Sequence, residues 1–176
     1  MSADFTQAVA SPRGERKSNR SIIELLVLYR SAMIDIVSAM RHMVLIGCVK
    51  TKAAHRCQCE VLYQSDLFKK SLRFARSLNP DSIFVLSAKY GLVPLDRTID
   101  PYEETLNRKP VKQVREWAAQ VISELEALSD LRRDRFTFLA AERYRRFLTP
   151  HLTHYEVPMQ GLGIGKQLQF LKEHFK

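Results

Sequence analysis

The sequence has 176 residues, of which 45% are hydrophobic and 27% charged, the composition of one globular domain that can bury a core. Its 28 Lys and Arg residues outnumber its 19 Asp and Glu residues and give a net charge of +9, which favours a polyanionic partner, nucleic acid before others. A run of about 18 apolar residues that could span a bilayer is missing, so a membrane protein is excluded and no membrane partner is expected.

The three cysteines, Cys48, Cys57 and Cys59, lie close together and are odd in number. This usage argues against a disulfide framework and for a reducing compartment. The charged segment near the amino end is followed by no cleavage-site pattern, so we expect a cytoplasmic protein. Together with His55 the cysteines offer four potential zinc ligands, but the Cys-x-Cys spacing differs from that of common zinc knuckles. We therefore expect buried cysteines, no bound metal and no cofactor.

Residues 1–42 are expected to form an extension of the compact domain. The first 20 residues are polar and are expected to be disordered. Apolar residues then recur at alternating four- and three-residue intervals from Ile22 to Met40, which predicts a helix over 21–41. A single domain is expected over 43–176, because Met43 stands directly before the first convincing apolar run.

Short apolar runs alternate with helical patterns from Met43 onward. Ser65 is expected to cap a helix, and Pro110 is expected to begin a longer one after a loop over 87–109. Strands that alternate with helices predict an α/β fold: a three-layer domain with a mainly parallel sheet of about four strands and helices on both faces. The expected strands are 44–48, 82–86, 135–140 and 155–157, and further helices are expected over 142–148 and 165–175.

Cations, glycines and aromatic residues follow the ends of the four expected strands. Ligands of open α/β sheets bind outside the carboxyl ends of the strands, so these segments predict one anion-binding cleft. In the last segment, glycines at every second position precede a lysine and a helix start, which suits a phosphate clamp, although they could merely permit a tight turn. The nucleic-acid-binding residues expected in this cleft are Lys50, Lys52, Tyr63, Ser87, Tyr90, Arg143, Gly161, Gly163 and Lys166.

Three arginines, Arg143, Arg145 and Arg146, interleave with Tyr144 and Phe147 after the third expected strand. This mixture suits phosphate contact combined with base stacking. On a helix, the two rings could equally belong to the core, and this alternative stays open.

The long loop over 87–109 contains the acidic candidates for catalysis. A loop of this length inside a small domain is usually functional or disordered, and its proline and aromatic content favours order. Asp100 is the first choice for a carboxylate that orients water and stabilises an oxocarbenium-like sugar, with Lys89 and Tyr102 as leaving-group or orienting partners. The alternative is that Asp100 only caps a turn before Pro101.

Four segments together resemble a bacterial and phage domain family. Its pattern is a Cys-x-x-Lys-type opening, a Leu-Tyr-x-Ser-x-Leu-Phe segment, and a Leu-Ser-Ala-Lys-Tyr-Gly-Leu block followed by a Pro-Tyr element. That family is similar, more distantly, to YaaA-type peroxide-stress proteins and to uracil-DNA glycosylase-like and tRNA transglycosylase-associated folds, which implies a nucleic-acid base site. The resemblance covers about 43–176, and its segments here are 46–52, 62–68, 86–93 and 100–102.

The leading hypothesis is a DNA glycosylase-like enzyme that flips a damaged or modified base out of the duplex and hydrolyses its N-glycosidic bond without a metal, in phage defence or DNA repair. DNA is expected as the partner before RNA. Two alternatives remain: a non-catalytic DNA-binding or stress-response module that uses the same cleft, and a metal-dependent nuclease, for which the only acidic cluster is 96–104.

Overall fold

The computed structural model describes Glu24 and residues 39–174 of the chain. The chain divides into two units, Met1–Ala39 and Met40–Lys176, and the fold described below is that of the second unit. The helix expected over 21–41 falls almost wholly outside the described residues; Glu24 is helical, whereas 39–41 are not.

A mainly parallel sheet forms the centre of the domain, as the sequence predicts. The strand order is β4-β3-β1-β6-β7, in which β1, β3, β6 and β7 are parallel and β4 runs antiparallel to β3. Residues 43–46 of the central strand are at most 2% exposed, because a strand covered by helices on both faces must be apolar throughout. The strands are β1 (His42–Gly47), β3 (Ser82–Ser87), β4 (Gly91–Pro94), β6 (Arg135–Leu139) and β7 (His154–Glu156).

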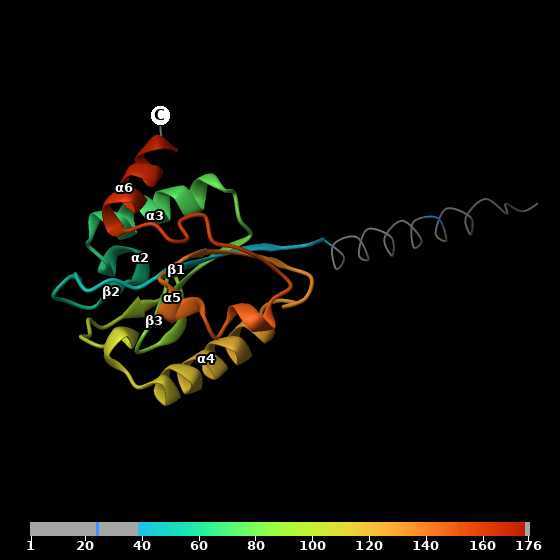
Figure 1. Cartoon of the computed structure of the whole chain (residues 1–176), viewed down its shortest axis with the longest axis horizontal. Helices are drawn as coiled ribbons and strands as arrows, with labels where there is room; N and C mark the ends of the chain where they lie inside the picture. Colours follow the sequence, from blue (N-terminus) through green and yellow to red (C-terminus); the bar gives the residue numbers. More distant parts are fainter. Residues whose placement is uncertain (1–23, 25–38, 175–176) are drawn as a thin grey trace, which may run out of the picture. The chain divides into compact units, whose positions relative to one another are not determined.

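Helices cover both faces of the sheet, which confirms the three-layer prediction (Figure 1). On one face, α3 (Asp66–Ser77) packs against β1 and against α6 (Ile164–Glu173), while α4 (Val111–Glu126) lies on the other face. The expected cap is present: the Ser65 hydroxyl accepts a hydrogen bond from the backbone N–H of Phe68 at 3.2 Å. The shorter helices are α2 (Cys59–Leu62), α5 (Glu142–Arg145), η1 (Leu106–Arg108) and η2 (Thr149–His151).

The segment expected to be a loop over 87–109 is instead partly regular. A turn after β3 reverses the chain into β4, and Gly91 permits it by adopting a φ of 71°, a conformation that other residues rarely take. Further along, β5 (Thr98–Ile99) pairs with β2 (Cys57–Gln58) in a two-stranded sheet. The strands that pair here are short and carry no hydrophobic periodicity of their own. The hydrophobic pattern of the sequence therefore does not predict them.

A chain of polar side chains links three neighbouring strands of the sheet. His42 on β1 is 7% exposed, and its Nε2 lies 2.8 Å from the Thr137 hydroxyl on β6. That hydroxyl donates to Glu156 of β7 at 2.6 Å, and the Arg135 guanidinium lies 3.0 Å from His42 Nδ1. The chain of contacts therefore ties β1, β6 and β7 together.

No helix in the described part of the chain is both long and apolar enough to cross a bilayer.

Candidate functional site

A pocket of about 940 Å³ lies at the carboxyl ends of the parallel strands, the position where ligands of open α/β sheets bind. Its walls come from 46–52 at the end of β1, from 138–142, Tyr144 and Arg145 around the end of β6, and from the segment after β7. Residues of the β5–α4 connection and of α3 complete it. Its volume is within the range of small-molecule sites.

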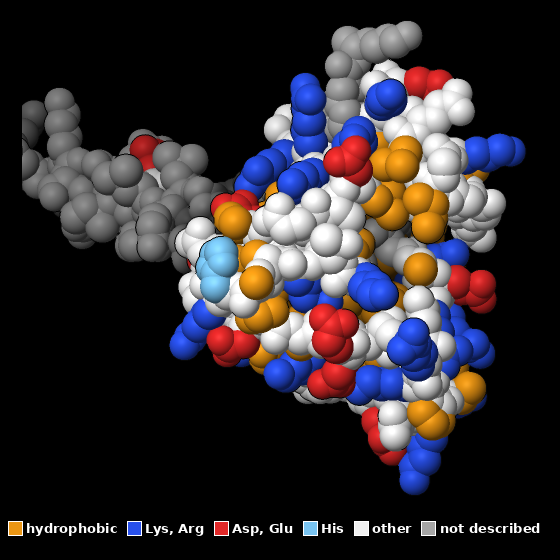
Figure 2. All heavy atoms as spheres, turned by 90° about the vertical axis from the view of Figure 1, so that its left-hand side faces the viewer, with side chains coloured by type: hydrophobic (Ala, Val, Ile, Leu, Met, Phe, Trp, Pro, Cys, Tyr) orange, Lys and Arg blue, Asp and Glu red, His pale blue; other side chains and the backbone are white. Residues whose placement is uncertain are grey.

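Side chains of both charges line this pocket. The cations could hold an anionic ligand, and the carboxylates could orient water or receive a proton. The lining cations are Lys50, Lys52, Arg108 and Arg145, and the lining carboxylates are Glu103, Glu104 and Glu142. Figure 2 shows that Lys and Arg side chains are spread over the viewed face of the molecule, with acidic side chains between them.

Lys52 enters the pocket from the segment after β1. Its Nζ lies 4.2 Å from the centroid of the Tyr102 ring, a cation–π contact. Burial lowers the pKa of Lys52, and the nearby Cys48 and Glu103 oppose this shift. Lys52 is therefore a cation that gives up its proton more readily than an exposed lysine. Lys50 also lines the pocket and is exposed.

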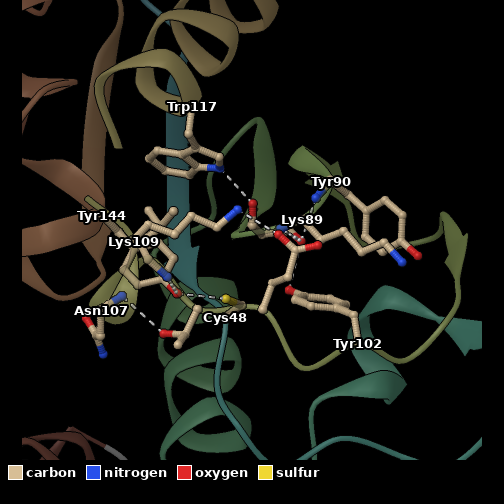
Figure 3. A network of polar contacts seen from close by, with 12 residues as sticks. Cys48, Lys89, Tyr90, Tyr102, Asn107, Lys109, Trp117 and Tyr144 are labelled. Carbon is tan, nitrogen blue, oxygen red and sulfur yellow. Dashed lines mark hydrogen bonds and ion pairs between the residues drawn. The ribbon is translucent and has the colours of Figure 1, made fainter. Parts of the chain in front are cut away.

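Cys48 and Tyr144 connect the end of β1 to the β5–α4 connection (Figure 3). The Cys48 thiol donates to the Tyr144 hydroxyl at 3.3 Å, and the same oxygen accepts the backbone N–H of Leu106 at 3.3 Å. The Tyr144 ring is 5% exposed and packs edge-on against Trp117. Tyr144 thus belongs to the core and presents only its polar end to the pocket.

Tyr63, Ser87 and Tyr102, which the sequence suggests as site residues, form a buried hydrogen-bond chain beside the pocket. The Tyr102 hydroxyl lies 2.8 Å from that of Tyr63 and accepts from Ser87 Oγ at 2.8 Å. Ser87 Oγ in turn accepts the backbone N–H of Tyr90 at 3.0 Å. Burial raises the pKa of both Tyr63 and Tyr102, so both rings stay protonated. None of these three side chains lines the pocket; they anchor the surrounding loops.

The structure does not bring Asp100 or Lys89 into the pocket. Both are exposed, and Lys89 Nζ instead lies 5.0 Å from the centroid of the Tyr90 ring. The backbone carbonyl of Asp100, not its carboxylate, is near the Tyr90 hydroxyl, at 3.5 Å. The reason is the buried side chain of Tyr102, which fixes the loop so that the residues after it, rather than those before it, reach the pocket. The structure therefore does not bring these two residues together with the cations that line the pocket.

Glu103 and Glu104 are the loop carboxylates that line the pocket. Glu104 forms an ion pair with Lys109 at 2.7 Å. Within the described residues, no ion pair involves Glu103. Of the two loop carboxylates, Glu103 is therefore the better placed to act on a ligand, and its proximity to Lys52 is reflected in the pKa of that lysine.

Arg143 serves the structure rather than a ligand. Its Nε donates to the carbonyl of Leu106 at 2.5 Å, and its guanidinium also donates to the carbonyl of Lys109. Both contacts hold η1 in place, and Arg143 does not line the pocket. Of the three arginines that the sequence analysis groups as suited to phosphate contact, Arg145, two residues later, lines the pocket.

The glycine-containing segment after β7 supplies one pocket wall. Gly161 lines the pocket and adopts a φ of 75°. Gly163 is the N-cap of α6 and does not line the pocket, and Lys166 is exposed and lies outside it. Only the first part of the segment expected to form a phosphate clamp therefore lines the pocket.

The cysteines beyond Cys48 lie away from the pocket. Burial raises the pKa of Cys59 to about 12, so this thiol is unreactive at neutral pH. Over the part of the chain that the structure describes, no three His, Cys, Asp or Glu side chains are grouped so that they could hold a metal ion.

Fold and pocket together define an α/β domain with a mainly parallel sheet and a ligand pocket of mixed charge at the carboxyl ends of its strands. Residues 43–173 match the model of a family described as "Family of unknown function (DUF6884)", and the chain belongs to this family. Neither the curated proteins nor the solved structures include a match to the chain.

Proposed function

We propose that this protein is a DNA glycosylase-like enzyme, which takes a damaged or modified base into the pocket and hydrolyses its N-glycosidic bond without a metal ion. The observation that carries the proposal is the placement of Glu103 and Lys52 in one pocket at the strand ends. A carboxylate and a cation facing one ligand are the two groups that this reaction needs.

The chemistry assigns one step to each group. Glu103 accepts a proton from water as the water oxygen bonds to C1′ of the sugar, and its charge stabilises the oxocarbenium-like transition state. Lys52 donates a proton to the departing base nitrogen as the C1′–N bond breaks. The lowered pKa of Lys52 favours this transfer, because an ammonium group with a lower pKa is a stronger acid and gives up its proton more readily.

DNA is the proposed substrate for two reasons. The net charge of +9 favours a polyanion, and extrusion of a base from the duplex is how such enzymes reach their target. The family that the sequence resembles is similar, more distantly, to uracil-DNA glycosylase-like and YaaA-type proteins, and this agrees with the choice. A cytoplasmic role in DNA repair or phage defence fits the same substrate.

The test is base release from modified duplexes. The protein is incubated, with EDTA present, with duplexes that carry uracil or oxidised, alkylated, hydroxymethylated or glucosylated bases, and abasic sites are detected by alkaline cleavage. Glu103→Gln should lower the rate of release by at least about 100-fold, the usual contribution of a positioned base. Asp100→Asn is the matched control, because Asp100 lies in the same loop but outside the pocket, and it should retain the wild-type rate.

Two results would contradict the proposal. Duplex binding without release of any base would favour the non-catalytic DNA-binding module. Strand cleavage that requires added magnesium would favour the nuclease.

A further inference from the structure

Arg145 has an unused hydrogen-bond donor beside the pocket. It is the last residue of α5 and lines the pocket. Its Nε is fully buried and has no hydrogen-bond partner, the only such buried side-chain nitrogen or oxygen found among the described residues.

A buried donor without an acceptor is costly. Leaving such a group unpaired costs about 1–3 kcal/mol, and more for a charged one, so native proteins rarely keep one without a reason. The pocket contains three carboxylates, yet no ion pair among the described residues involves Arg145. The protein thus leaves this guanidinium without an internal counterion at a place that a ligand can reach.

The chemistry of guanidinium indicates which ligand would satisfy it. Arginine presents a planar fork of donors that matches the oxygens of a phosphate or carboxylate group. Because its Nε holds no hydrogen bond, the side chain can turn toward such an anion without breaking one there. Lys50 lines the same pocket and adds to its positive charge.

We infer that Arg145 binds a phosphate group of the substrate, so that the pocket takes a nucleotide unit rather than a free base or a nucleoside. This inference rests on the proposed function and narrows it to a substrate class. The phosphate could belong to a free mononucleotide or to a nucleotide within a strand, and the experiment separates these two sources.

Binding is measured by calorimetry at constant ionic strength. The ligands are the deoxynucleoside 5′-monophosphates, the matching deoxynucleosides, inorganic phosphate and a single-stranded oligonucleotide. The variants are Arg145→Ala, Arg145→Lys and, as the matched control, Arg146→Ala. Arg146 follows directly in the chain, is exposed, and lies 4.6 Å from the Phe147 ring outside the pocket. A thermal unfolding curve for each variant verifies that it is folded.

Wild type and Arg146→Ala should bind a phosphate-bearing ligand more tightly than the matching nucleoside. Arg145→Ala should lose about 10- to 100-fold in affinity for that ligand and should bind nucleosides unchanged, as the loss of a charge-assisted hydrogen bond predicts. Arg145→Lys should recover only part of this affinity, because an ammonium lacks the planar fork. Binding of monophosphates would assign the phosphate to a free nucleotide, and binding of the oligonucleotide alone would assign it to a strand.

Equal affinity of folded Arg145→Ala and wild type for every phosphate-bearing ligand would overturn the inference. Its failure is distinguishable from failure of the proposed function. Base release by wild type with an unchanged KM in Arg145→Ala would support the glycosylase proposal and contradict the phosphate site. Phosphate-dependent binding through Arg145 without base release from any duplex would support the phosphate site and contradict the glycosylase proposal.

Discussion

At the scale of single residues, His42 shows how a buried ionisable group can couple folding to pH. Burial and the neighbouring Arg135 lower the pKa of His42 below its ordinary value of 6.5, while Glu156 and Asp81 oppose the shift. The contacts fit a neutral ring: Nδ1 accepts a hydrogen bond from Arg135, and Nε2–H donates one to the Thr137 hydroxyl, which in turn donates a hydrogen bond to Glu156.

The sign of the pH effect follows from this lowered pKa. Below pH 6.5 the unfolded chain takes up a proton on His42 more readily than the folded protein does, so the free energy of unfolding falls as the pH drops. We expect that His42→Gln reduces the loss of stability between about pH 7.5 and about pH 5, measured by urea unfolding. His151→Gln, at an exposed residue, should show the wild-type pH dependence. An unchanged pH dependence in His42→Gln would contradict the assignment.

The candidate site illustrates where residue types can be predicted and individual residues cannot. The sequence correctly favours cations after β1 and a carboxylate from the long loop, but it selects Asp100 where the structure presents Glu103. It also selects Arg143 where the structure presents Arg145. Residues two positions apart on a helix point in directions about 200° apart, so Arg143 and Arg145 face different surroundings. Only the packed structure shows which of them faces the pocket.

At the scale of elements, helix α3 depends on a cap that the sequence identifies. Ser65 accepts the backbone N–H of Phe68, one of the donors that the first turn leaves without a partner. Ser65→Ala should lower the free energy of unfolding by about 1 kcal/mol, measured by chemical denaturation. Ser77→Ala removes a hydroxyl from the other end of the same helix, where it donates to the Phe74 carbonyl, and should change stability by less than about 0.5 kcal/mol. Equal effects of both changes would argue against the cap.

The larger elements were predictable because each carries its own periodicity. The apolar runs that form β1, β3 and β6 and the apolar stripes of α3 and α4 each lie within a short stretch of sequence. Composition and spacing therefore reveal these elements. By contrast, β5 has two residues and pairs with a segment about 40 residues earlier, Cys57–Gln58. No short window of sequence contains that information.

At the scale of the whole molecule, the parallel arrangement of β1, β6 and β7 gathers their carboxyl ends at one pocket, as the sequence predicts. The segment after β3 ends at the same edge but does not line the pocket. Ser87 there is fully buried and bonded to Tyr102, so the loop that carries Tyr102 takes its place. The loop that carries Tyr102, rather than the segment after β3, forms this wall of the pocket, and only tertiary packing determines which of the two does so.

If DNA binds over this edge of the sheet, its affinity will fall steeply with salt, because each phosphate contact releases counterions. Lys50→Ala should reduce the slope of log K against log salt concentration by roughly 0.9, measured by fluorescence anisotropy of a labelled duplex. Arg132→Ala is the control, because Arg132 is exposed and precedes the amino end of β6, on the opposite edge. Equal slopes for wild type and Lys50→Ala would place the DNA elsewhere.

The pocket draws its walls from parts of the chain that are made at very different times. One wall contains 48–52, and another contains Met159, Gly161 and Gln167. On the ribosome, β1, β3, β4 and β6 can all be present while the second wall is still unsynthesised. A growing chain therefore cannot assemble the complete pocket until the residues after β7 have been made, so ligand recognition has to wait for the last part of the chain.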